Sequence, residues 1–247
     1  LMEERKAVMK EGIEQGLAGT DYSGRILGSQ APEFKRAAEK GTLPAGEMLN
    51  TIIASVSALM EVKSSMGLIV AAPTAGSCGG LPGAVLGAAA VRGSSKADIT
   101  DAMLAAGLIG VIIAGGATFA AEEGGCQAEC GSGSGMAAAG LCVLAGGSLD
   151  QCVAAASLAL QNSLGWTCDP VANRVEVPCL GKNVMAAANA LSCVSMAMAG
   201  FDPVIPLDEV VETMNRVGPS LPRELRCTAL GGLSVTPSAR QIEKGLS

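Results

Sequence analysis

The sequence predicts an all-α fold, a single compact domain over residues 1–247 of tightly packed Ala/Gly-rich helices with cysteine-bearing loops. Hydrophobic residues make up 49% of the chain but aromatic residues only 2%, so small side chains must let the helix backbones approach closely. Apolar residues recur at helical spacing, and almost no stretch alternates with a period of two. The length of 247 residues suits one large domain or two small ones, and because no linker or change of composition divides the chain, we expect one.

The helix boundaries follow from the caps and breakers along the chain. A charged amphipathic helix comes first, Ser94, Ser95 and Asp98 cap a later one, and the tail from Pro219 is expected to be irregular. The expected helices are Met2–Gly16, Glu33–Lys40, Gly46–Gly67, Ala84–Val91, Ala102–Ala121, Met136–Ala145, Asp150–Leu164, Val184–Ala199 and Leu207–Arg216.

The segment 102–121 carries no charge and is long enough to cross a bilayer, so a small-residue membrane carrier is one alternative. Ala, Gly and Ser dominate it, however, and insert weakly, and its flanking charges are acidic rather than basic. We therefore expect buried helices in a soluble protein.

Composition excludes or disfavours several functions. A net charge of −6 without a basic stripe argues against nucleic-acid binding. The absence of histidine removes the commonest general base and every Ser–His or Cys–His arrangement from this chain. Nine cysteines spread over a long chain, with no signal segment at its start, suggest a cytoplasmic protein in which loop cysteines serve metal binding or catalysis.

Two Gly- and Pro-rich segments, 120–136 and 167–179, are predicted as loops and carry Cys126, Cys168 and Cys179. Zinc usually takes four ligands from tight Cys or His pairs, which this chain lacks, whereas iron–sulfur clusters accept thiolates at wider spacing. Spacing alone leaves two interpretations open, a metal centre or small buried hydrophobic residues. The second is expected for Cys142, Cys152 and Cys193, which lie in apolar helical runs.

Several motifs resemble the α chain of the iron–sulfur-dependent L-serine dehydratases (L-serine ammonia-lyases). They cover nearly the whole chain in the right order: 72–83 (APTAGSCGGLPG), 125–129 (GCQAE), 168–171 (CDPV), 177–179 (VPC) and 226–238 (RCTALGGLSVTPS).

The resemblance implies a four-iron four-sulfur cluster held by three cysteines, which fall on Cys126, Cys168 and Cys179, with the fourth iron left open for substrate. Cys130 lies where relatives often lack cysteine, so it is expected not to be a ligand. Single-chain relatives can carry a C-terminal cysteine that reaches the cluster, whereas this sequence ends in Gly-Leu-Ser247.

The implied reaction converts L-serine to pyruvate and ammonia, with iron assisting loss of the hydroxyl as a Lewis acid and without pyridoxal phosphate. The predicted substrate-binding residues are Thr74, Gly76, Ser77, Lys182 and Asn183. The first three could instead form only a tight turn between helices. The last two could instead be a helix N-cap and a solvated lysine. Glu122, Glu123 and Glu129 are weaker acid–base candidates.

Since this chain has no histidine, the resemblance implies that the family's β chain supplies the catalytic base. We also expect the protein to form a homo- or hetero-oligomer. The remaining alternative is a non-catalytic zinc or thiol module.

Overall fold

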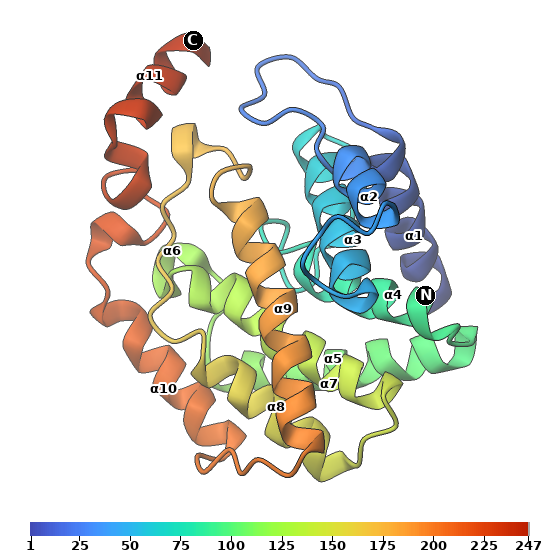
Figure 1. Cartoon of the computed structure of the whole chain (residues 1–247). Helices are drawn as coiled ribbons and strands as arrows, with labels where there is room; N and C mark the ends of the chain where they lie inside the picture. Colours follow the sequence, from blue (N-terminus) through green and yellow to red (C-terminus); the bar gives the residue numbers. More distant parts are fainter. Residues whose placement is uncertain (247) are drawn as a thin grey trace.

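The computed structural model describes residues 1–246, and over these residues it contains eleven α-helices and no strand (Figure 1). The all-α prediction is therefore confirmed. The helices are α1 (Met2–Ala18), α2 (Ala31–Glu39), α3 (Glu47–Ser64), α4 (Gly80–Arg92), α5 (Lys96–Gly116), α6 (Ala121–Gly124), α7 (Ser132–Leu144), α8 (Leu149–Gln161), α9 (Cys179–Met198), α10 (Leu207–Ser220) and α11 (Pro237–Leu246).

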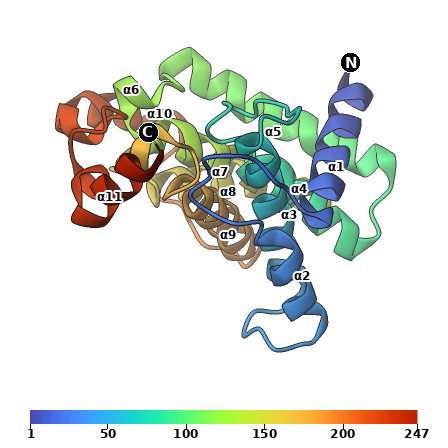
Figure 2. The same cartoon turned by 90° about the horizontal axis from the view of Figure 1, so that it is seen from above.

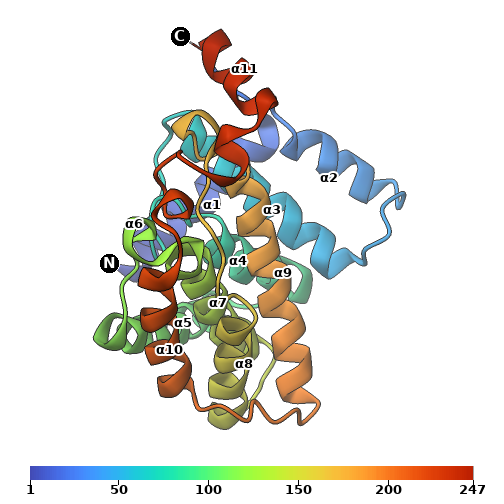
Figure 3. The same ribbon diagram turned by 90° about the vertical axis from the view of Figure 1, so that its left-hand side faces the viewer.

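Helix α7 lies in the middle of the molecule, where it packs against α4, α5, α8 and α9 (Figures 1 and 3). Nearly all of its residues are buried. Small residues make this possible: a Cβ on Gly140 would lie 3.0 Å from the carbonyl oxygen of Ala102 on α5. The core is thus built by close approach of helix backbones, as the composition predicts.

Three predictions about where helices begin or are interrupted are wrong. Helix α4 begins at Gly80 rather than near residue 84, since the Asn183 side chain accepts hydrogen bonds from the free backbone N–H groups of Gly79 (3.3 Å) and Gly80 (2.9 Å). Helix α9 begins at Cys179 rather than after residue 183. The predicted loop at 120–136 is largely helical, with α6, a π-helical turn over Gln127–Gly131 and the start of α7.

Helix α5 begins at a capping box formed by Ser95 and Asp98, as the sequence predicts. Its outer face is apolar: the side chains of Leu104, Leu108 and Val111 are more than half exposed. Only 39% of its most apolar window is buried, so the expectation of a buried helix is wrong for this outer face. Among residues 1–246, α5 alone is long and apolar enough to cross a membrane, a test that core helices of soluble proteins also pass.

The chain after α10 follows two 3₁₀ turns, Arg223–Leu225 and Gly232–Val235, and ends in α11. The prediction of an irregular tail is therefore correct only up to the start of α11 at Pro237. This C-terminal segment rises along the same side of the molecule as the connection between α8 and α9 (Figures 1 and 2). Helix α11 ends near the loop 19–30, where a Cβ on Gly24 would lie 3.8 Å from Leu246 Cδ2.

Candidate metal centre

The three predicted ligands come from different elements and meet on one side of the core. Cys126 precedes the π-helical turn, Cys168 lies in the α8–α9 connection, and Cys179 is the first residue of α9. Cys126 and Cys168 belong to one small buried cluster. Burial raises the pKa of the Cys179 thiol to about 12, and the nearby Cys126 adds to this shift. The structure thus brings the three together, although no three Cys, His, Asp or Glu side chains within residues 1–246 are arranged to bind a single metal ion.

Glycines fix the first cysteine segment by allowing contact with other elements. A Cβ on Gly131 would lie 2.5 Å from Ser163 Oγ, and a Cβ on Gly133 would lie 2.9 Å from Ser77 Oγ. Gly125 has φ +70°, and its Cβ would lie 2.7 Å from the Trp166 carbonyl oxygen, so no other residue fits there without strain. These glycines therefore serve close packing rather than flexibility, and they hold Cys126 against the second cysteine segment.

The Cys126 thiol is paired with Cys130, one helical turn further on. A hydrogen bond with Cys130 lowers the pKa of Cys126 against the effect of burial, and the positive charge of Lys182 lowers it further. The same contact raises the pKa of Cys130. Within this pair the thiolate, the form that binds metals, is therefore favoured at Cys126 over Cys130.

The second cysteine segment is held by the C-terminal tail. Cys168 N–H donates to the Leu225 carbonyl (2.8 Å), and Cys227 N–H donates to the Cys168 carbonyl (2.8 Å), in a short parallel bridge. The thiols of Cys168 and Cys227 also interact, which raises the pKa of Cys168 and lowers that of Cys227. Two cysteines far apart in the sequence thus lie side by side.

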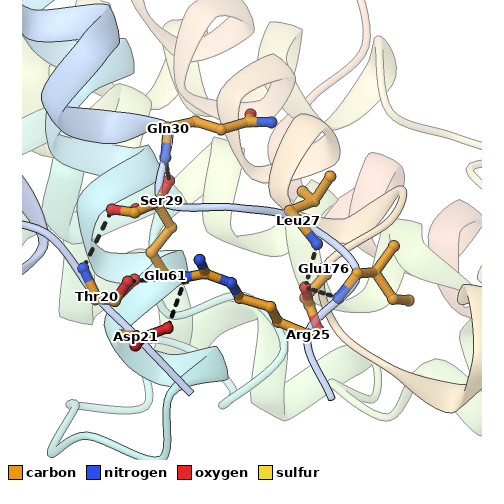
Figure 4. Close-up of polar contacts among 9 residues, drawn as sticks. Thr20, Asp21, Arg25, Leu27, Ser29, Gln30, Glu61 and Glu176 are labelled. Atoms are coloured by element: carbon orange, nitrogen blue, oxygen red, sulfur yellow. Dashed lines mark hydrogen bonds and ion pairs between the residues drawn. The ribbon is translucent and has the colours of Figure 1, made fainter. Parts of the chain in front are cut away.

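Two buried carboxylates fasten the loop 19–30 to this region (Figure 4). Glu176, within the second cysteine segment, accepts hydrogen bonds from the backbone N–H groups of Ile26 and Leu27, both at 2.8 Å. Glu61 on α3 accepts from the N–H groups of Gln30 (2.8 Å) and Ala31 (2.9 Å). The loop therefore depends on one carboxylate from the core and one from the segment that carries Cys168 and Cys179.

Lys182 is largely buried, so the alternative that it is only a solvated lysine beside a helix cap is wrong. Its ammonium group forms an ion pair with Asp169 at 2.7 Å, with both side chains largely buried, and it donates to the Thr167 carbonyl. Burial lowers the pKa of Lys182, but the hydrogen bond to Asp169 and the nearby Cys126 outweigh it, so the pKa is raised. A permanent positive charge thus lies beside the thiols.

Asn183 is fully buried, and both ends of its amide are occupied by this chain. Its oxygen caps α4, while its nitrogen donates to the carbonyls of Gly76 (3.0 Å) and Cys179 (2.9 Å). The side chain therefore joins the turn at 74–77 to the start of α9. A direct contact between Asn183 and substrate stays a prediction, whereas its positioning contacts are observed.

The predicted substrate turn faces the first cysteine segment. Thr74 Oγ1 donates to Glu129 at 2.7 Å, and a Cβ on Gly76 would lie 2.9 Å from the Glu129 carboxylate, so glycine is needed there. The Ser77 hydroxyl is fully buried and has no hydrogen-bond partner with good geometry among residues 1–246, although it lies close enough to Cys130 to affect that thiol. Burial raises the pKa of Glu129.

Sequence reasoning assigned no role to Cys227, Asp169 or Glu176 and gave Glu129 only a minor one. Asp169 lies in the quoted motif beside Cys168, so its position was a usable signal. Nothing local in the sequence indicates that Cys227 reaches Cys168 or that Glu176 fastens the loop 19–30, because both contacts join distant parts of the chain.

Fold and site together define an all-α protein with five cysteines, a buried ion pair and a carboxyl group gathered at one side of its helices. Residues 1–234 match the family described as serine dehydratase alpha chain. The chain belongs to this family, which favours the dehydratase interpretation over a membrane carrier or a zinc or thiol module.

Three relatives illustrate the match. The chain is 37% identical to a probable L-serine dehydratase alpha chain of Bacillus subtilis, over 98% of this chain and 81% of the relative. It is 42% identical to an L-serine dehydratase alpha chain of Peptoniphilus asaccharolyticus, over 91% and 76% of the two chains. It is 39% identical to L-serine dehydratase 1 of Escherichia coli, over 72% of this chain but only 40% of that longer protein.

Proposed function

We propose that this chain is the cluster-bearing α subunit of an L-serine dehydratase, which converts L-serine to pyruvate and ammonia. The observation that carries the proposal is the convergence of Cys126, Cys168 and Cys179, the three cysteines on which the family resemblance places the cluster. A four-iron four-sulfur cluster takes thiolate ligands and spans several ångströms, so its ligands need not meet at one point.

Two features beside Cys126 and Cys179 favour an anionic metal centre, although burial acts against ionisation of these thiols. Cys179 stands at the N-terminus of the 20-residue helix α9, where the helix dipole favours a thiolate. The Lys182 ammonium group lowers the pKa of Cys126 and opposes the effect of burial on Cys179. When bound, the cluster supplies an iron with an open position that acts as a Lewis acid on the serine hydroxyl.

The remaining residues bind and orient the amino acid. Ser77 offers a buried hydroxyl without a good partner in the described chain, and the neighbouring turn offers backbone N–H groups, which together suit a carboxylate. Lys182 adds positive charge beside the thiols. Asn183 fixes the turn relative to α9 and so positions Gly76 and Ser77.

A partner supplies the base in this proposal. The chain contains no histidine, relatives are named as alpha chains, and the E. coli relative extends well beyond the part that matches. Glu129, whose pKa is raised by burial, is the carboxyl group that this chain places at the substrate turn, where it can exchange a proton with a bound ligand. The protein is proposed to act in the cytoplasm as a complex with a β chain.

The test is anaerobic reconstitution with iron and sulfide, followed by visible and electron paramagnetic resonance spectroscopy. The wild type should bind about one cluster per chain, Cys168→Ala should lose it, and Cys193→Ser, a buried cysteine on α9 away from the other thiols, should retain it. A cluster that forms equally well in Cys168→Ala would contradict the ligand assignment. High serine deamination by the reconstituted chain alone would contradict the need for a β chain.

A further inference from the structure

Cys227 lies outside the proposed ligand set, yet it is in backbone contact with Cys168, and the two thiols are close enough to shift each other's pKa. The backbones of the two segments run in a parallel bridge that pairs Cys168 with Arg226, and Cys227 follows directly. Cys227 N–H donates to the Cys168 carbonyl oxygen at 2.8 Å, so the backbones of the two cysteines are in direct contact. The backbone therefore holds the two cysteines side by side while both thiols are free.

The surrounding contacts keep the two segments in register. The second carboxylate oxygen of Asp169 accepts a hydrogen bond from Leu233 N–H at 2.9 Å, and Ser234 Oγ donates to the Pro170 carbonyl at 2.9 Å. A Cβ on Gly232 would lie 2.5 Å from the same Asp169 oxygen, so the tail passes in direct contact with this carboxylate. Cys227 consequently cannot move far from Cys168 while the tail is folded.

Access from solution distinguishes this pair from the other paired thiols. Cys227 is partly exposed, whereas Cys168 is only 5% exposed. The pairs Cys126–Cys130 and Cys142–Cys152 are buried in both members. A reagent in solution therefore meets Cys227 first, and the adjacent Cys168 is placed to react with whatever forms there.

We propose that Cys227 and Cys168 form a modifiable dithiol, which a small disulfide such as oxidised glutathione converts into an intramolecular disulfide whenever the metal centre is absent. Cys227 sulfur attacks the glutathione disulfide, one glutathione leaves with the proton of Cys227, and a mixed disulfide forms. Cys168 sulfur then attacks the Cys227 sulfur, and the second glutathione leaves with the proton of Cys168. Two protein thiols are oxidised and one glutathione disulfide is reduced to two thiols.

The consequence is competition for one sulfur atom, and this part rests on the proposed function, in which Cys168 is a ligand. A Cys168 sulfur bound to Cys227 cannot bind iron, so the oxidised chain must be reduced before a cluster can assemble. A bound cluster would in turn hold Cys168 and protect the pair from oxidation.

The first experiment treats the full, reduced, cluster-free chain with oxidised glutathione and maps its disulfides by mass spectrometry without reduction. The expected product is one internal disulfide between Cys168 and Cys227. Cys168→Ser should instead carry glutathione on Cys227, and Cys227→Ser should gain neither the disulfide nor glutathione on Cys168 in the same time. A first disulfide between Cys126 and Cys130, or glutathione on a buried cysteine before Cys227, would overturn the proposal.

The second experiment measures iron content and visible absorbance after reconstitution, with and without prior treatment by oxidised glutathione. Treatment should lower cluster binding at least several-fold in the wild type and in the control Cys193→Ser but leave Cys227→Ser unchanged. An equal loss in Cys227→Ser would overturn the competition. If even the untreated chain binds no cluster, the proposed function fails, while peptide mapping still decides whether the Cys168–Cys227 dithiol exists.

Discussion

The two segments that carry the proposed ligands are held in place in different ways. The first, around Cys126, is helical and is fixed by glycines that pack against neighbouring helices. The second, between Cys168 and Cys179, is irregular and depends on polar partners from distant parts of the chain, including Lys182, the tail and the loop 19–30. The free energy of unfolding should therefore be sensitive to side-chain volume in the first segment and to the loss of a single charge in the second.

The largest effect is expected from Asp169→Ala in the second segment. The substitution leaves Lys182 without its buried partner and removes the acceptor of Leu233 N–H, so the free energy of unfolding should fall by about 3–5 kcal/mol. Urea unfolding of the cluster-free chain measures this change in the free energy of unfolding. The matched control is Asp101→Ala on the exposed side of α5, which should change stability by less than about 0.5 kcal/mol. A similar small change in both variants would show that polar contacts do not hold this segment.

A smaller effect is expected from Gly131→Ala in the first segment. The new methyl group would lie 2.5 Å from Ser163 Oγ, a short side chain that is itself fully buried, so overpacking should cost roughly 1–3 kcal/mol. Gly181→Ala, in the first turn of α9 beside Cys179, meets no atom within 4 Å and should cost nothing. Unfolding midpoints of the two variants should therefore move apart, and equal midpoints would contradict the packing role of Gly131.

The contrast also explains what the sequence could predict. Helical periodicity and capping residues are local signals, so the existence of the main helices and the capping box at Ser95 were predicted correctly. The glycines near Cys126 predict a loop, because glycine destabilises isolated helices. In the folded chain the same glycines are required for contact between helices, and tertiary packing outweighs their low helix propensity.

The site shows the same division. The convergence of Cys126, Cys168 and Cys179 was predicted from motifs rather than from spacing, and the structure places these residues on one side of the core. The pairing of Lys182 with Asp169 and of Cys168 with Cys227 depends on how loops cross in space. No periodicity or local motif encodes such contacts, so they required the structure.

The link between the second segment and the loop 19–30 gives a more local test. In Glu176→Gln one carboxylate oxygen becomes an amide nitrogen, which weakens the hydrogen bonds from Ile26 and Leu27 by about 1 kcal/mol. Amide hydrogen exchange should accelerate at these two residues and much less at Gln30 and Ala31. Glu61→Gln should give the reverse pattern. Uniform acceleration along the loop in both variants would mean that the two carboxylates do not act separately.

The smallest effect concerns Glu129, the charge that the first segment buries. Its pKa in the folded chain lies above the ordinary value of 4.5, so the folded state binds the proton more tightly than the unfolded state does. The resulting stabilisation is complete below pH 4.5 and is lost as the pH rises through the folded pKa. The Gln side chain in Glu129→Gln cannot ionise, so the variant should not lose this stability as the pH rises.

The measurement compares unfolding free energies of the cluster-free wild type and Glu129→Gln across that interval. The stability of the wild type relative to the variant should decrease as the pH rises, and the exposed Glu123→Gln should show no comparable trend. A relative stability that rises with pH would mean that the hydrogen bond from Thr74 outweighs burial, and the first segment would then also depend on a single polar contact, as the second does.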